Sequence, residues 1–356
     1  MCRKLDKKVA PRLDSARHEL LHGILKQVSR SFYLTLNVLP ATVRDQMGLA
    51  YLFARAADTI ADTDLIGREQ RLRYLTQFRT QFSSGPAARR DMHAIQAALI
   101  PHQADSAERV LLQRLEDCLT LYDQFDPADQ ERIRWLMGVL PDGMTMDLTH
   151  FQGDSAQDLT AFQTLDELDQ YTYYVAGCVG EFWTRMVCAH CPSMSGWDVK
   201  KMSALGVRFG KGLQLTNIVK DLARDLHRGR CYVPEPLLRE AGLTPVDLLN
   251  RENLPKFRPV LMRLIKMAIE HLDQGWMYTM ALPRLEIRQR LACMWPILLA
   301  GETLKRVAAA PDLLDPSVNV KAPRSVVYRV MALTTFTGGC GYVGTAYWGR
   351  LRKQIV

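Results

Sequence analysis

The sequence predicts an all-α protein, a single domain whose helices form a bundle around a central cavity. Apolar residues recur at the three- and four-residue spacing of an amphipathic helix, as in Leu20, Ile24 and Val28. Strand-type alternation bounded by hairpin turns is scarce, and the irregular stretches are short. With 356 residues, 47% of them hydrophobic, the chain can bury a large core.

The predicted helices are separated by clusters of Gly, Pro and polar residues. These breaks fall at Pro40 and at residues 83–90, 125–130, 150–158, 190–198, 227–236 and 311–325. No repeat of fixed period and no low-complexity block interrupts the pattern. We therefore expect one domain over residues 1–356, with a core from about 15 to 335 and a tail from about 336 to 356.

The charge is basic, with 46 Lys and Arg against 38 Asp and Glu. This balance suits an anionic small molecule, a membrane surface or a nucleic acid. No nucleic-acid-binding signature accompanies it, so we expect no nucleic-acid partner. Cys188 and Cys191 form a lone CxxC beside His190, and because a second pair is missing we expect buried free thiols there rather than a metal site.

The terminal segments bear on localisation. The first 20 residues lack the apolar core of a signal peptide, and no window of about 20 apolar residues indicates a spanning helix. We therefore expect a cytoplasmic protein with no obligate protein partner. The tail mixes Tyr342 and Trp348 with Arg350 and Arg352, which fits either a peripheral contact with the inner membrane surface or a packed terminal segment.

One predicted helix carries two like charges on one face. In "YLFARAADTIADT" the carboxylates of Asp58 and Asp62 are four residues apart, on the stripe that also holds Tyr51 and Arg55. Neighbouring carboxylates cost roughly 0.2–0.5 kcal/mol on a helix. Since the flanking residues are apolar or alanine, an ordinary solvated acidic face is the weaker interpretation.

A second helix repeats this arrangement. "GKGLQLTNIVKDLARDLHRGR" places Gln214, Asn217, Asp221 and Asp225 on one stripe, below Gly210. Two such helices can face each other in a bundle, and their hard oxygen ligands suit Mg²⁺, which binds through a few carboxylates plus substrate phosphates. A di-iron site is disfavoured because the Glu-x-x-His pattern is absent.

Basic and aromatic residues accompany the two acidic pairs. Arg30, Ser31, Arg55 and Lys220 are placed to hold the oxygens of a diphosphate. The segment "YTYYVAGCVGEFW" brings Tyr171 and Tyr174 close to Gly177 and Gly180 on one helix. The glycines indicate either close helix packing or room for a bulky ligand, and the tyrosines either line the cavity or pack in the core.

The segments "SRSF", "DTIAD", "YTYYVAGCVG" and "LQLTNIVKDLARD", in this order, resemble the signature set of the squalene and phytoene synthase family from about Ser29 to Pro234. The resemblance implies an all-helical isoprenoid-synthase fold and an enzyme that joins two prenyl diphosphates head to head with Mg²⁺. It places Asp58, Asp62, Asn217, Asp221 and Asp225 at metal and diphosphate, Arg30, Ser31, Arg55, Lys220 and Gln214 at phosphate oxygens, and Tyr171 over the reacting carbons.

The later segment "VNVKAPRSVVYRVM" resembles the part of the reducing, squalene-forming branch that meets NADPH, which implies a cofactor role for Lys321 and Arg324. The expected substrates are two molecules of farnesyl diphosphate and the expected product is squalene, as in a bacterial-type enzyme of sterol or hopanoid biosynthesis. The chain departs from that branch at Arg290 and Ala292, where aromatic residues are expected.

Four alternatives stay open at this point. Dehydrosqualene and phytoene synthases perform the condensation without the reduction. A terpene cyclase of the same fold would act on one substrate. A non-catalytic scaffold relative would be expected to lose its aspartates, all four of which are present here.

Overall fold

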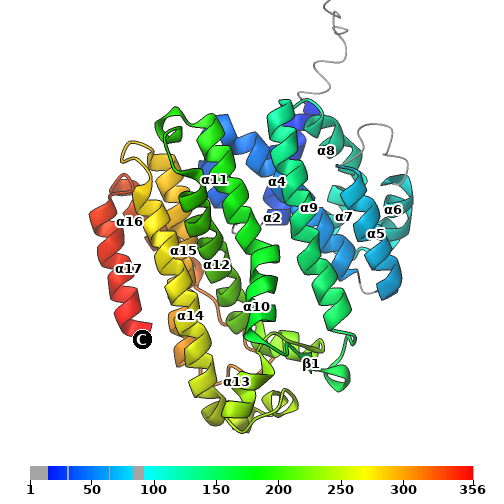
Figure 1. Ribbon diagram of the computed structural model, residues 1–356, viewed down its shortest axis with the longest axis vertical. Helices are drawn as coiled ribbons and strands as arrows, with labels where there is room; N and C mark the ends of the chain where they lie inside the picture. Colours follow the sequence, from blue (N-terminus) through cyan, green and yellow to red (C-terminus); the bar gives the residue numbers. More distant parts are fainter. Residues whose placement is uncertain (1–14, 30–31, 64, 83–91, 356) are drawn as a thin grey trace, which may run out of the picture. The chain divides into compact units, whose positions relative to one another are not determined.

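The computed structural model describes residues 15–29, 32–63, 65–82 and 92–355 and divides into two compact units, Met1–Thr145 and Met146–Val356. Helices account for nearly all the regular structure in the described ranges (Figure 1), which confirms the all-α prediction. The expectation of a single domain over residues 1–356 stays a prediction.

The first unit consists of short and medium helices around α4. Its elements are η1 Glu19–Ile24, α2 Leu25–Ser29, α3 Phe32–Val38, α4 Ala41–Asp62, α5 Arg68–Thr80, α6 Met92–Leu99, η3 Ile100–His102, α7 Ser106–Gln113, α8 Leu115–Tyr122 and the first part of α9 Pro127–His150. Helix α4 begins after Pro40, whose fixed backbone suits a helix start. Its buried face centres on Phe53, which meets the rings of Phe78, Phe82 and Tyr122 at 4.8–6.4 Å between centroids.

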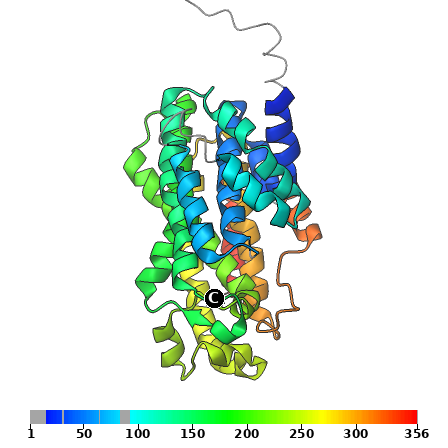
Figure 2. The ribbon, with the colours of Figure 1, turned by 90° about the vertical axis from the view of Figure 1, so that its right-hand side faces the viewer.

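The second unit is built on long helices. Its elements are the end of α9, η4 Ala156–Asp158, β1 Thr160–Ala161, α10 Leu165–Thr172, η5 Tyr173–Gly177, α11 Cys178–His190, η6 Pro192–Met194, α12 Val199–His227, β2 Arg230–Cys231, α13 Glu235–Glu240, η7 Val246–Leu249, η8 Arg251–Asn253, α14 Leu254–Ala281, α15 Ile287–Ala309, α16 Arg324–Phe336 and α17 Gly341–Ile355. Figure 2 shows these long helices running along the vertical axis. Helix α12 packs against α11, α14 and α15.

Glycines allow the backbone of α12 to come into direct contact with the backbones of α11 and of the π-helical turn η5. A Cβ added at Gly180 would lie 1.9 Å from the carbonyl oxygen of Gly206, and one added at Gly210 would lie 2.2 Å from that of Ala176. Any larger side chain would force these backbones apart. Of the two interpretations of the helix glycines, close packing is therefore the one that the structure confirms.

We expect Gly180→Ala to lower the free energy of unfolding by about 3 kcal/mol, because the added methyl group overlaps a backbone carbonyl that cannot move away cheaply. The matched control is Gly349→Ala on α17, where a Cβ meets nothing within 4 Å and helix propensity favours alanine by up to about 1 kcal/mol. Thermal and urea unfolding of both variants measure the difference. Equal stability of the two would contradict the close crossing at Gly180.

The C-terminal segment is a packed helix. On α17 the ring of Trp348 stacks on Trp276 of α14 at 6.3 Å between centroids, and its indole N–H donates to Asp273 at 2.8 Å. Tyr347 donates to the buried Glu302 of α15 at 2.6 Å, an interaction that helps hold α17 on α15. The sequence-based boundary near residue 335 therefore separates parts that pack together. None of the described helices combines the length and apolarity that crossing a bilayer requires.

Candidate active site

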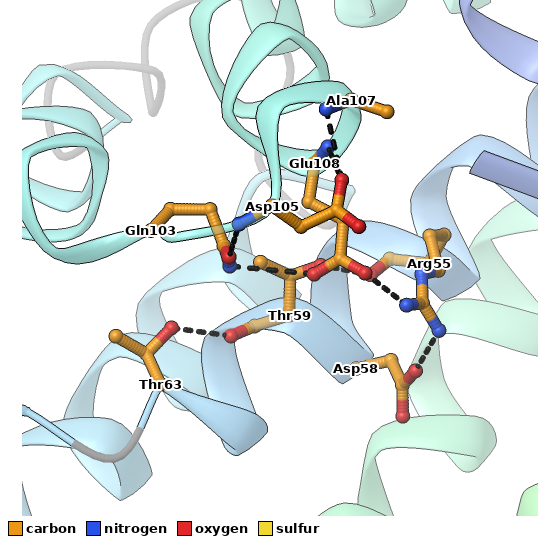
Figure 3. Close-up of polar contacts among 8 residues, drawn as sticks. All are labelled: Arg55, Asp58, Thr59, Thr63, Gln103, Asp105, Ala107 and Glu108. Atoms are coloured by element: carbon orange, nitrogen blue, oxygen red, sulfur yellow. Dashed lines mark hydrogen bonds and ion pairs between the residues drawn. The ribbon is translucent and has the colours of Figure 1, made fainter. Parts of the chain in front are cut away.

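The first acidic pair lies on α4, and an arginine on the same helix reaches one of its members. Arg55 Nη1 lies 2.6 Å from Asp58 Oδ2, and Arg55 Nη2 forms an ion pair with Glu108 of α7 (Figure 3). Asp58 is partly exposed, and Asp62, the last residue of α4, is exposed. The two carboxylates stand on one stripe of the helix, as predicted.

Glu108 is itself held by several donors. Thr59 Oγ1 donates to its Oε2 at 3.0 Å, and Gln103 Nε2 donates to the same oxygen at 3.3 Å. Asp105 caps α7 by accepting from the backbone N–H of Glu108 at 3.1 Å, which fixes the start of that helix. Figure 3 shows Thr59 and Gln103 reaching the carboxylate of Glu108, which in turn contacts the guanidinium of Arg55.

This arrangement defines what Arg55 does within its unit. Burial alone would lower the pKa of Arg55, but Asp58 and Glu108 outweigh that effect and raise it above its usual range. The guanidinium therefore offsets part of the negative charge beside the acidic pair. Both of its terminal nitrogens contact carboxylates, so its role at a substrate phosphate stays a prediction.

Arg30 and Ser31, the other predicted phosphate ligands of this half, lie outside the described residues. The chain resumes at Phe32, whose ring stacks on Tyr51 of α4 at 5.5 Å between centroids. Tyr51 begins the stripe that continues to Arg55 and Asp58.

The second acidic pair lies near the C-terminal end of α12. Asp221 lies between two bases, with Lys220 Nζ at 3.0 Å and Arg224 Nη1 at 3.2 Å from its carboxylate oxygens. Lys220 also donates to Asn217 Oδ1 at 3.2 Å. The structure therefore brings three of the predicted residues into direct contact, Asn217, Lys220 and Asp221. The predicted phosphate ligand Gln214 lies one turn before Asn217 on the same stripe and is partly buried.

Asp225 has a different environment from Asp221. Burial raises the pKa of Asp225 to about 7, with further increases from Asp221 and Asp147, against a lowering effect of Arg230 and Arg228. A carboxylate in this position carries negative charge that its surroundings do not fully compensate. A divalent cation is the kind of ligand that would stabilise its ionised form.

Beside Asp225 the structure places the predicted Tyr171 together with three residues that the sequence did not predict, Asp147, Arg230 and Tyr232. Asp147, near the end of α9, accepts from the hydroxyl of Tyr171 at 3.2 Å and from that of Tyr232 at 3.1 Å, both at the same oxygen, Oδ2. Arg230 Nη1 lies 3.7 Å from this oxygen. The two tyrosine rings stack at 4.9 Å between centroids.

Both tyrosines are buried, which determines their protonation state. Burial, with the nearby charge of Asp147, raises the pKa of Tyr171 and of Tyr232 well above its usual range. Each hydroxyl is therefore protonated at neutral pH and donates to Asp147. Phe151 and Phe162 pack around the pair, with ring centroids 5.1–5.7 Å from those of the tyrosines, and make the surroundings of the two rings largely apolar.

A short parallel bridge holds the base of this group in place. Thr160 of β1 pairs with Arg230 of β2, and the turn that ends α12 passes through Gly229 at φ 77°. A side chain at Gly229 would be strained at this φ and would also meet the carbonyl oxygen of Ser155 at 2.9 Å. The bridge therefore fixes the backbone segment from which the side chains of Arg230 and Tyr232 extend.

The predicted cofactor residues lie elsewhere in the same unit. Lys321 is in the irregular stretch before α16, and Arg324 is the first residue of that helix, and both are exposed. Arg290, which replaces an aromatic residue of the expected pattern, is buried and donates to the carbonyl oxygens of Leu282 at 2.8 Å and Gly339 at 3.1 Å. That departure therefore serves the fold.

The donor set fits magnesium. Within the described ranges no three or more His, Cys, Asp and Glu side chains gather closely enough to hold a metal by themselves. Each acidic pair instead offers two hard carboxylates with bases alongside, Asp58 and Asp62 on α4 and Asp221 and Asp225 on α12. Mg²⁺ typically retains waters and takes its remaining ligands from substrate phosphates, so two carboxylates per pair suffice.

Comparison with solved structures identifies the fold. The chain is similar to TcSQS in complex with the ligand BPH1237, with a TM-score of 0.76 at 21% identity, covering 97% of this chain and 91% of that one. A dehydrosqualene synthase in complex with a ligand matches with a TM-score of 0.59 at 20% identity, covering 91% and 98%. The fold is thus the all-α isoprenoid-synthase fold.

Residues 25–325 match the family model for squalene/phytoene synthase, and the chain belongs to that family. Members are prenyltransferase-type enzymes that use diphosphate substrates with Mg²⁺, so this chain is an enzyme of that class.

Curated relatives come from both branches of the family. Squalene synthase ERG9 of Saccharomyces cerevisiae is 25% identical over 321 residues, covering 90% of this chain and 68% of the relative. The bifunctional lycopene cyclase/phytoene synthase of Podospora anserina is 25% identical over 316 residues, covering 85% of this chain and 48% of the relative. The chloroplastic phytoene synthase of Narcissus pseudonarcissus is 33% identical over 170 residues, covering 46% and 38%. The chain thus spans about half or less of the length of these two phytoene synthase relatives.

Proposed function

We propose that the protein condenses two molecules of farnesyl diphosphate head to head to a cyclopropyl diphosphate and then reduces this intermediate to squalene with NADPH. The observation that carries the condensation is the arrangement in the second unit, where a helix with Asp221 and Asp225 ends beside the buried group of Tyr171, Asp147 and Tyr232. This combination would provide charged ligands for the diphosphate of a substrate beside buried aromatic side chains that suit its prenyl chain.

The acidic and basic residues would bind the diphosphate end. Asp58, Asp62, Asp221 and Asp225 would hold Mg²⁺, which when bound draws negative charge onto the departing diphosphate. Asn217 would add a further oxygen ligand. The bases Lys220, Arg55 and Arg30, with Ser31 and Gln214, would contact phosphate oxygens.

Tyr171 and its partners would act at the hydrocarbon end. Loss of diphosphate from one substrate leaves an allylic cation. The alkene of the second substrate attacks this cation and joins the two chains, and a proton must then leave a carbon atom as the cyclopropane closes. Tyr171 can take that proton on its hydroxyl oxygen while its own proton passes to Asp147, so no phenolate is required. The aromatic ring can also stabilise the cation. Phe151 and Phe162 help to exclude water, which would otherwise quench it.

The reductive step is the finer part of the proposal. Lys321 and Arg324 are two exposed cations three residues apart and suit the phosphates of NADPH. A hydride from the nicotinamide would trap the cation that forms when the remaining diphosphate leaves and the cyclopropane opens. The similarity to phytoene synthases supports the alternative in which the reduction does not occur and the product is dehydrosqualene or phytoene.

Product analysis tests both the condensation and the reduction. With farnesyl diphosphate and Mg²⁺ we expect the cyclopropyl diphosphate, and with NADPH added we expect squalene. Lys321→Ala with Arg324→Ala should leave the condensation intact and lower squalene formation about a hundredfold at limiting NADPH, because two phosphate contacts are lost. Lys200→Ala with Lys201→Ala, two exposed lysines on α12, is the matched control.

Each outcome has a distinct meaning. Dehydrosqualene from the wild-type protein despite NADPH would place it in the non-reducing branch. Phytoene from geranylgeranyl diphosphate, with no product from farnesyl diphosphate, would change the substrate. Squalene formation by the double variant equal to that of wild type would remove Lys321 and Arg324 from the cofactor site.

A further inference from the structure

Two turns at one end of the second unit expose large apolar side chains. In the turn between α14 and α15 and the first residue of α15, Leu285 is 93% exposed and Ile287 41%. At the turn between α16 and α17, Phe336 is 91% exposed and Tyr342 84%. Side chains this exposed protrude into solvent, which costs free energy unless something covers them.

The two turns lie next to each other. Arg290 donates to Leu282 in the first turn and to Gly339 in the second, so one buried guanidinium joins both. A Cβ at Gly338 would lie 3.8 Å from Ile287 Cδ1. Figure 1 shows the yellow α14–α15 turn and the red α16–α17 turn side by side at the upper left. The four apolar side chains therefore belong to one surface, which we call the apolar tip: Leu285, Ile287, Phe336 and Tyr342.

Two bases flank the apolar tip on the side of the first turn. Arg284 and Arg288 flank Leu285 and are exposed. The acidic residue of the first turn, Glu286, accepts from Ser193 Oγ at 2.5 Å, within the fold.

We propose that the apolar tip inserts shallowly into the headgroup region of an anionic lipid bilayer, with Arg284 and Arg288 at the lipid phosphates. Protruding apolar and aromatic side chains with exposed arginines beside them are typical of an interfacial surface, and the charge of Arg284 and Arg288 complements acidic lipids. The site is formed by two turns of the folded unit. It therefore differs from an amphipathic tail, because the rest of α17 packs on α14 and α15.

The exposed Cys340 at the second turn provides a probe of insertion. Backbone N–H groups of Val343 and Tyr342 lower the pKa of its thiol, which favours labelling. An environment-sensitive fluorophore on Cys340, in a Cys2→Ser and Cys188→Ser background, should shift to the blue with vesicles of phosphatidylglycerol and phosphatidylcholine in equal parts. Vesicles of phosphatidylcholine alone should give a much smaller shift, and added salt should reduce it.

Substitutions then test the surface in the full-length protein by vesicle co-sedimentation. Leu285→Ser with Phe336→Ser should weaken partition about tenfold, because both side chains lose their apolar contact with lipid. Arg284→Gln with Arg288→Gln should weaken binding about fivefold or more on the anionic vesicles alone. Val246→Ser on η7, another exposed apolar residue, is the matched control and should bind as wild type does.

Two results would overturn the proposal. Equal partition of wild type and Leu285→Ser with Phe336→Ser, or no vesicle binding by wild type, would exclude a lipid surface here. A wild-type dimer in analytical ultracentrifugation that this double substitution converts to a monomer would instead identify the apolar tip as a contact between two copies. Neither readout depends on the reaction that the enzyme performs.

Discussion

Asp58→Asn and Asp221→Asn are each expected to reduce the rate of condensation by about a thousandfold at saturating Mg²⁺. Each substitution keeps the shape of the side chain and removes one of the charges proposed to hold the metal, which contributes several kcal/mol to stabilising the leaving diphosphate. Steady-state assays with farnesyl diphosphate across a range of Mg²⁺ concentrations measure the effect.

The same variants should remain folded. Asp221 loses its ion pairs with Lys220 and Arg224, which are partly exposed and therefore weak, and it also ceases to repel Asp225. We expect the free energy of unfolding without metal to stay within about 0.5 kcal/mol of wild type. Asp312→Asn, at an exposed position, is the control. Retention of most of the activity by either variant would refute the metal assignment.

Much of the fold could be predicted from the sequence because the spacing of apolar and polar residues along the chain indicates where helices form. The spacing of apolar residues predicted the helical class. The polar breaks at residues 150–158 and 190–198 separate α-helices of the structure, with only short 3-10 turns inside them, and the break at 227–236 runs from the end of α12 to the start of α13. The acidic pairs could be placed on helical stripes for the same reason, since positions four residues apart share a face. Contact of Asn217 with Lys220 follows from that geometry.

The residues that the sequence did not predict come together through distant segments. Asp147 lies 24 positions before Tyr171 and 85 before Tyr232, so no local period links them. Arg230 and Tyr232 were part of a stretch interpreted only as a break between helices, and the β1–β2 bridge that fixes them has two residues per strand. Glu108 meets Arg55 across 53 positions. An isolated acid following "GMTM" was the available signal for Asp147.

The amino-acid composition of the C-terminal segment did not predict whether that segment packs on the fold. Its aromatic and basic residues suited either a membrane surface or a packed tail. The packing of Trp348 on Trp276 decides for a packed helix, while Tyr342 on the same helix stays exposed. Which aromatic ring is buried depends on the surface presented by α14 and α15, and this information is not contained in the tail itself.

The second large effect is expected at Tyr171. Tyr171→Phe should lower kcat about a hundredfold while KM for farnesyl diphosphate changes little, because the hydroxyl is proposed to move a proton after the substrate has bound. Asp147→Asn should lower kcat similarly, since a neutral amide cannot receive the proton that Tyr171 passes on. Steady-state and single-turnover measurements of the condensation separate binding from chemistry.

Tyr232→Phe is the matched control for this prediction. Tyr232 is buried like Tyr171, stacks on it, and donates to the same oxygen of Asp147, so its loss removes an equivalent hydrogen bond worth about 1 kcal/mol of stability. If the hydroxyl of Tyr171 has a chemical role, Tyr171→Phe must be slower than Tyr232→Phe at equal stability. If the two variants lose the same activity, the two tyrosines have only a packing role, and the proton must leave by another route, for which the departing diphosphate is a base that the reaction itself provides.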